Sequence, residues 1–301
     1  MTIGTSLFHA QAGARFSAIG AEIAGLQAQI SAGKADPRPS ADPVRALNLS
    51  AAQEQGARLE RYAGNLDRAA GRLALADTAL EAGVDIMQRV RELAVAASSD
   101  TMNLTARDAI RSELQGLRSG LVDVANARDE TGLLFGGLTT RGVAFEHDAN
   151  GVVYRGDQGQ QQLRSSESGT VATGLPGPVL FGGIDDGAGG ETDVFAVISR
   201  FQEQLDTPQP GGMNDVMDSV VKAADHLADG RARIGAMAAN VDRQSDATEG
   251  RQVRLTETLS GLEDLDIAAV VTELNRKLLT REASQQSFVA IGRSSLFDYM
   301  R

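Results

Sequence analysis

The stretch FSAIGAEIAGLQAQI (residues 16–30) spaces its large apolar side chains in alternating steps of 3 and 4. These side chains belong to Phe16, Ile19, Ile23, Leu26 and Ile30. This spacing places one apolar stripe along one side of a helix, as in a coiled coil. A lone helix of this length is marginal in water and gains stability mainly by docking its apolar face. The stretch therefore predicts a helix that packs against a partner.

A second narrow stripe lies near the other end of the chain, in DIAAVVTELNRKLLTREASQQSFVAIGRSSL (266–296). Polar Arg281 and Gln285 interrupt it. Its apolar members are Ile267, Val271, Leu274, Leu278, Phe288, Ile291 and Leu296. Residues 1–33 carry one basic and one acidic side chain, and residues 265–301 carry five basic and four acidic ones. Both ends are close to neutral, so they can approach one another without a large Coulomb penalty.

In a single chain, these two end stripes would bury only each other. Each also lies beyond a break in the helical pattern. We therefore expect both segments to become ordered on assembly, with their apolar side chains forming an interface between copies of the chain.

Two long helices are predicted between the ends. The first spans 43–97, with Asp42 as its N-cap and Pro43 at its first position, and would be roughly 80 Å long. A third segment, around 110–124, has one apolar face and is expected to turn back on the first long helix. The second long helix spans 213–263 and would be roughly 75 Å long.

The pattern between these helices indicates short strands. Glycines in TGLLFGGLTTRG (131–142) end the helical spacing, and VAFEH and GVVYR then flank DANG (148–151). This arrangement predicts a hairpin that turns at Asn150–Gly151. Further strands are expected near QQLRSS (161–166) and TVATG (170–174), followed by the turn-rich LPGPVLFGG and the loop IDDGAGGETD.

The predicted fold is mainly α with a small β-rich insertion, an elongated antiparallel helical rod with coiled-coil terminal helices. Its two end stripes would meet at the end of the rod opposite the insertion. The predicted segments are an N-terminal coiled-coil helix (1–33), the first part of the rod (34–139), a β-rich outer domain (140–193), the returning part of the rod (194–264) and a C-terminal coiled-coil helix (265–301).

Composition excludes several functions. The chain of 301 residues has no cysteine, so disulfides and thiolate chemistry are excluded. Its net charge of −11 disfavours general nucleic-acid binding, which needs clustered cations. No run approaches the roughly 18 apolar residues of a membrane span, and we expect no membrane contact. The first residues lack the basic and apolar regions of a cleavable signal peptide.

No residues are predicted to be catalytic, to bind a cofactor or to bind a metal. The three histidines, His9, His147 and His226, fall in separate segments, whereas a metal site or a catalytic triad needs groups that converge. DDGAGGETD (185–193) lacks the spacing of a calcium loop, and YRGDQG (154–159) is better explained as a glycine turn after a strand. A soluble helical enzyme would need a convergent polar pocket that this pattern does not indicate.

Three ordered segments resemble the flagellin and hook-associated protein family. They are QISAGKADPRPSADPVRALNL (29–49), the pair LLFGGLTTRGVAF and VVYRGDQGQ (133–160), and LEDLDIAAVVTELNRKLLTREASQQSFVAIGRSSLFDYM (262–300). In this family, flagellins usually carry an SSG-containing stretch where this chain has PSADPV. The chain is thus closer to the branch of the family that forms the hook–filament junction.

The resemblance implies a non-enzymatic subunit of the bacterial flagellum that acts in motility. It implies a ring of identical chains between hook-associated protein 1 on the hook side and the flagellin filament, and transient binding to an export chaperone. Family members leave the cell through the flagellar type III export channel and are extracellular. The alternative within the family is a flagellin, the filament subunit itself.

Overall fold

The computed structural model describes residues 2–35, 40, 42–98, 103–148, 151–187 and 189–299. The side chains of residues 2–6, 8 and 291–299 lie outside this description. The helices are α1 (Thr2–Ala32), α2 (Pro43–Ala97), α3 (Leu104–Ala125), α4 (Gly177–Phe181), α5 (Val194–Asp206), α6 (Gly212–Glu263) and α7 (Ile267–Tyr299). The predicted class, mainly α with a small β-rich insertion, is confirmed.

The strands form antiparallel pairs. These pairs are β1 (Arg128–Asp129) with β2 (Gly132–Leu133), β3 (Phe145–Asp148) with β4 (Gly151–Tyr154), β5 (Gln162–Arg164) with β6 (Thr170–Ala172), and β7 (Ile184–Asp185) with β8 (Glu191–Thr192).

The chain divides into two compact units. Unit 1 consists of Met1–Ala57 and Gln252–Arg301, and unit 2 consists of Arg58–Arg251. The long helices α2 and α6 each contribute to both units. The finer division into five segments stays a prediction.

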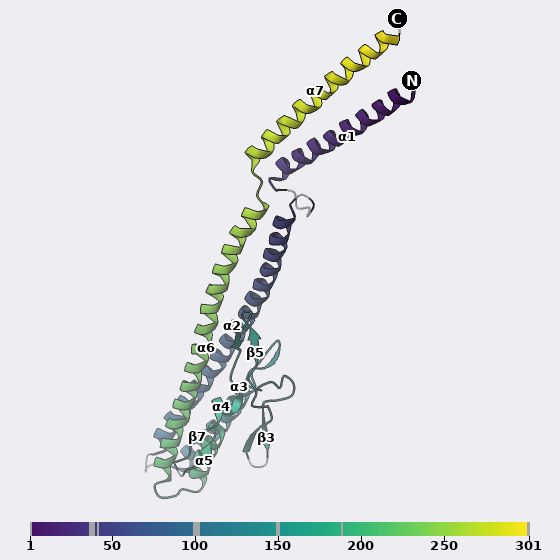
Figure 1. Cartoon of the computed structure of the whole chain (residues 1–301). Helices are drawn as coiled ribbons and strands as arrows, with labels where there is room; N and C mark the ends of the chain where they lie inside the picture. Colours follow the sequence, from purple (N-terminus) through teal and green to yellow (C-terminus); the bar gives the residue numbers. More distant parts are fainter. Residues whose placement is uncertain are drawn as a thin grey trace. The chain divides into compact units, whose positions relative to one another are not determined.

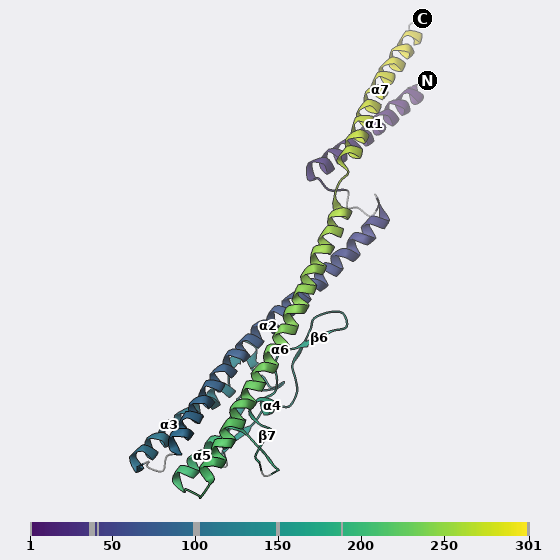
Figure 2. The same cartoon turned by 90° about the vertical axis from the view of Figure 1, so that its left-hand side faces the viewer.

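In unit 2, α2 and α6 lie side by side and run in opposite directions (Figures 1 and 2). Arg231 on α6 forms ion pairs with Asp77, at 2.9 Å, and with Glu81, at 3.2 Å, on α2. A methyl group at Gly83 of α2 would lie 3.6 Å from Leu121 on α3 and 3.8 Å from Leu227 on α6. Both distances are those of ordinary van der Waals contacts, so three helices meet at position 83, and the predicted return of α3 along α2 is confirmed.

An apolar stripe along α2 forms part of the core of unit 2. Its buried members on α2 are Leu59, Leu66, Ala69, Leu73, Ala76, Leu80, Met87, Val90 and Ala94. The predicted cap at the start of α2 is also present, because the Asp42 carboxylate accepts a hydrogen bond from Arg45 N at 3.0 Å. Residues 99–102, where the sequence ends this helix, lie outside the described residues.

The β region begins earlier in the chain than the sequence suggested. Its first strand starts at Arg128, and the hairpin of β1 and β2 lies before residue 140, where the predicted β-rich domain begins. The hairpin of β3 and β4 is confirmed, with Asp148 opposite Gly151. Asn150, which was expected in the turn of this hairpin, lies outside the described residues. The turn-rich 175–183 contains the short helix α4, and the expected loop 184–193 closes as the hairpin of β7 and β8.

Phenylalanine side chains join the β region to the helices. The Phe145 ring on β3 lies 5.3 Å from the rings of Phe181 on α4 and Phe195 on α5. Phe135, which follows β2, lies edge-on to Phe181 at 5.4 Å. All four side chains are buried in the same core as α2, so the strands pack on the helices as part of unit 2.

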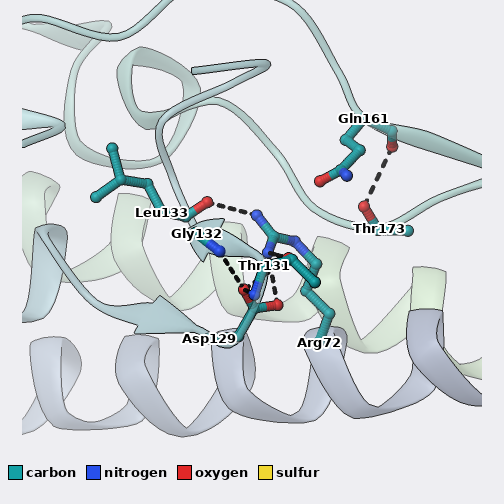
Figure 3. Close-up of polar contacts among 7 residues, drawn as sticks. All are labelled: Arg72, Asp129, Thr131, Gly132, Leu133, Gln161 and Thr173. Atoms are coloured by element: carbon teal, nitrogen blue, oxygen red, sulfur yellow. Dashed lines mark hydrogen bonds and ion pairs between the residues drawn. The ribbon is translucent and has the colours of Figure 1, made fainter. Parts of the chain in front are cut away.

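A buried ion pair fixes the first hairpin to α2 (Figure 3). The Arg72 guanidinium donates to Asp129 Oδ2 at 2.6 Å, to Thr131 Oγ1 at 2.9 Å and to the Leu133 carbonyl. The other carboxylate oxygen of Asp129 accepts hydrogen bonds from Thr131 N, Thr131 Oγ1 and Gly132 N at 2.7–2.9 Å. Charge and hydrogen-bonding capacity are therefore matched inside the unit, as a buried pair requires.

Burial on its own would raise the pKa of the Asp129 carboxyl. The hydrogen bonds from Thr131 and from the Arg72 guanidinium outweigh burial and hold this pKa below its ordinary value. Because the pKa is depressed in the folded state, the ionised carboxylate stabilises the fold at neutral pH. That contribution is lost as the pH falls through the range in which Asp129 takes up a proton.

We expect Asp129→Asn to lower the free energy of unfolding at pH 7 by about 3 kcal/mol, since it leaves the Arg72 guanidinium buried without a carboxylate. Urea unfolding followed by circular dichroism measures this change. The gap between variant and wild type should narrow below about pH 4, where the wild type loses the same charge.

The matched control is Glu146→Gln. Glu146 pairs with Arg155 at 3.0 Å on the surface, so its loss should cost at most about 1 kcal/mol. Equal destabilisation by the two variants would contradict the role given to the buried pair.

Candidate assembly interface

In unit 1, the terminal helices α1 and α7 pack together and run in opposite directions (Figure 1). The Phe288 ring on α7 lies edge-on to Phe16 at 5.9 Å and to His9 at 5.2 Å on α1. Further along the pair, Lys277 Nζ lies 2.6 Å from the Glu22 carboxylate. The two end stripes predicted from the sequence thus belong to helices that contact each other within one chain.

The stripe on α1 is as expected. Ile23 is only 5% exposed, and its neighbours along the stripe, Phe16, Ile19, Leu26 and Ile30, are half-buried. Most positions between them are exposed. The alternating spacing therefore identifies the face of α1 that packs within the chain.

Within one chain, the stripe on α7 coincides only in part with the face that packs. Ile267 is 54% exposed and Val271 is 38% exposed, whereas the sequence placed both on the packed face. The half-buried positions include Val270, Leu274, Lys277, Leu278, Arg281, Ser284 and Phe288. The side chains of Ile291 and Leu296 lie outside the described ones, and Gln285 is exposed. Their role in an interface between copies of the chain stays a prediction.

Lys277 is the packed residue that the apolar pattern missed. Its ammonium group pairs with Glu22, and the hydrogen bond and charge of this carboxylate raise the pKa of Lys277. The sequence did contain a sign of this pair. Glu22 is the one acidic side chain in residues 1–33, and it adjoins Ile19 and Ile23 of the stripe. An opposite charge on the facing helix would match it.

The segments that lead into the terminal helices are joined by what we call the linker bridge. Ala35 N donates to the Glu263 carbonyl at 2.8 Å, and Leu265 N donates to the Gly33 carbonyl at 3.2 Å. Lys34 Nζ also lies 2.6 Å from the Glu263 carboxylate. Gly33 ends α1 with a φ of 65°, a conformation that glycine adopts without steric cost. These contacts hold the end of α1 beside the end of α6.

Unit 1 buries few apolar side chains. Among the described residues, its buried hydrophobic side chains are Ile23, Ala52 and Leu255, and all the other buried ones belong to unit 2. Leu279 and Val289 on α7 are exposed, as are Ile267 and Val271. The terminal pair therefore leaves apolar surface in water that a further protein surface could cover.

Nothing in the described residues brings catalytic groups together. His9 lies against Phe288 on α7, His147 is exposed on β3 and His226 is half-buried on α6. No group of three or more potential metal ligands occurs among the described residues. No helix within the same ranges is both long enough and apolar enough to cross a membrane.

The aspartates of YRGDQG (154–159) and DDGAGGETD (185–193) have structural roles. The Asp157 carboxylate accepts hydrogen bonds from Leu138 N at 2.9 Å and Gly159 N at 2.7 Å, which fixes the turn after β4. In the other motif, Asp185 pairs with Lys222 at 3.1 Å, and Asp186 accepts a hydrogen bond from Gly190 N at 2.9 Å. These carboxylates shape loops of unit 2.

Comparison with known proteins gives two matching family models. The bacterial flagellin N-terminal helical region matches residues 3–132, and the bacterial flagellin C-terminal helical region matches residues 217–300. Together they cover more than two thirds of the chain. The chain is also similar to "Flagellar hook-associated protein 3" of Salmonella typhimurium, with 24% identity over 320 residues and coverage of 100% of both chains.

Two solved structures show a similar fold. FlgL of Xanthomonas campestris aligns with a TM-score of 0.63 at 23% identity, covering 69% of this chain and 99% of that chain. The flagellar junction protein FlgL from Legionella pneumophila aligns with a TM-score of 0.63 at 15% identity, covering 72% of this chain and 100% of that chain.

We expect the terminal helices to exchange amide hydrogens quickly in the dilute monomer. Because unit 1 buries so little, amides of residues 5–30 should exchange at least about a hundredfold faster than those of residues 66–94 in unit 2. Hydrogen exchange read by mass spectrometry measures both segments in the same full-length chain. Equal protection of the two segments in a sample shown to be monomeric by light scattering would contradict this expectation.

Proposed function

Since the chain belongs to the flagellin family, we propose that it is a structural adaptor subunit that joins the hook side of the bacterial flagellum to the flagellin filament. The observation that carries the proposal is the similarity to hook-associated protein 3 along the whole of both chains. The flagellin models stop at residue 132 and resume at residue 217, whereas this similarity also spans the region between them. The junction protein is therefore favoured over the filament subunit.

The terminal helices provide the means of assembly. Apolar surface that α1 and α7 leave exposed is covered when neighbouring subunits pack against it. Each 100 Å² of apolar surface removed from water contributes about 2.5 kcal/mol, and the gain repeats at every contact in a closed ring. The predicted interface residues are those of the two stripes. Of these, Ile267 and Val271 on α7 are exposed within one chain and available to a neighbour, whereas Ile23 on α1 is already buried within the chain.

The proposal specifies partners and location. The subunit forms a ring with copies of itself, contacts hook-associated protein 1 on one side and flagellin on the other, and binds an export chaperone before assembly. It leaves the cell through the flagellar type III export channel and acts outside the cell. Its role is non-enzymatic.

We expect a chain without residues 2–30, or one without residues 267–301, to keep unit 2 folded and to lose assembly. The reason is that the main apolar core lies between Leu66 and Val241, outside both deleted segments. Circular dichroism with thermal melting measures folding, and incorporation into isolated flagella measures assembly. A truncated chain that still incorporates would refute the role given to the terminal helices.

Localisation on flagella tests the function as a whole. An epitope-tagged full-length chain should lie at one position between hook and filament, and cells that lack the chain should shed unpolymerised filament protein. Labelling along the entire filament, or filaments formed by the purified chain alone, would identify a filament subunit instead. Absence from isolated flagella would overturn the proposal.

A further inference from the structure

Unit 1 contains an apolar groove beside the linker bridge. The end of α1, the start of α2 and the end of α6 line a space of about 670 Å³. The α1 wall carries small side chains, and a methyl group at Gly25 would meet no atom within 4 Å. Among the lining residues are Gly25, Ala28, Ala32, Leu49, Gln53 and Leu262. The groove therefore has room for branched apolar side chains.

The start of α2 also carries an exposed apolar face, which we call the α2 ridge: Val44, Leu47 and Ala51. Val44 is 69% exposed, Leu47 is 71% exposed and Ala51 is exposed as well. With about 100° between successive residues of a helix, the ridge points roughly 175° away from Leu49 and Gln53, which line the groove. The groove and the ridge thus lie on opposite sides of the same helical segment.

We propose that the α2 ridge of one subunit docks into the groove of the next copy of the chain. The inference rests on the proposed function and deepens it by naming the two surfaces that meet. Because the surfaces differ and face opposite ways, the contact is head-to-tail, and each added subunit presents a new free ridge or groove. Such a contact closes into a ring when its rotation permits.

The charges at the groove favour this occupant. The ridge is uncharged, so it brings no ionised group into the groove. At the groove, Lys34 and Glu263 already pair with each other at 2.6 Å. Docking would therefore add no charge to the groove and would leave the Lys34–Glu263 pair intact, so it avoids the high cost of burying an isolated charge. The groove also adjoins the α1–α7 pair, so one neighbour could cover both.

Cysteine pairing tests the contact directly, because the chain has no cysteine of its own. Two single variants, Leu47→Cys on the ridge and Ala28→Cys in the groove, carry different tags and are expressed together. Flagella are then isolated and treated with a mild oxidant. A disulfide between the two tagged chains is expected, since the bond requires Cα atoms less than about 7 Å apart. The matched control pairs Ala28→Cys with Leu75→Cys, an exposed position of α2 in unit 2, and should give no such product.

A second variant measures the strength of the contact. Leu47→Asp should reduce incorporation into flagella by at least about tenfold, because the carboxylate would lose its hydration in the groove. Leu75→Asp should incorporate as well as the wild type, and both variants should melt like it, since both side chains are exposed.

The outcomes separate this inference from the proposed function. Pairing of Leu47→Cys chains with each other, or normal incorporation of Leu47→Asp, would overturn the head-to-tail contact and leave the junction role intact. If the wild-type chain itself is absent from flagella, the proposed function fails and this contact fails with it.

Discussion

The apolar stripe of α2 between Leu66 and Ala94 is the surface on which most of the molecule is built. It is buried along its whole length by α3, α6 and the β region, which belong to the same core. Gly83 in the middle of this stripe faces both Leu121 and Leu227, so three helices meet at this point of the core. The β region adds its phenylalanine rings to this core and is anchored to α2 by the buried Arg72–Asp129 pair.

Unit 1 uses the same heptad-like spacing with a different energetic result. Two helices that pack only on one another bury one stripe each, and a stripe half-covered by a single neighbour contributes a fraction of the free energy of a closed core. Under the proposed function, unit 1 would obtain from other subunits part of the stability that unit 2 obtains within the chain. The proposed export and assembly would suit this division, because the terminal helices would become fully ordered only when neighbouring subunits are present.

The sequence was most informative where the pattern is local and repeated. Helix α2 begins at Pro43 and ends at Ala97 as predicted, and the burial of Ile23 follows from the spacing of its neighbours. Rotation of α7 about its own axis was not predictable from the apolar pattern, because Ile267 and Val270 are both apolar and either could begin the packed face. The Arg72–Asp129 pair joins residues 57 positions apart, and neither residue has an unusual sequence context. Tertiary contacts of this kind have no local signature.

The linker bridge sets the rotational phase of the two terminal helices. Its backbone hydrogen bonds fix where α7 starts relative to the end of α1, so residues 264–266 act as a spacer of defined length. One residue inserted there would turn every side chain of α7 by about 100° and bring a different row of residues towards α1. Side-chain changes in this spacer leave the phase intact, whereas a change in its length does not. Residues 264–266 are therefore expected to tolerate substitutions better than insertions or deletions.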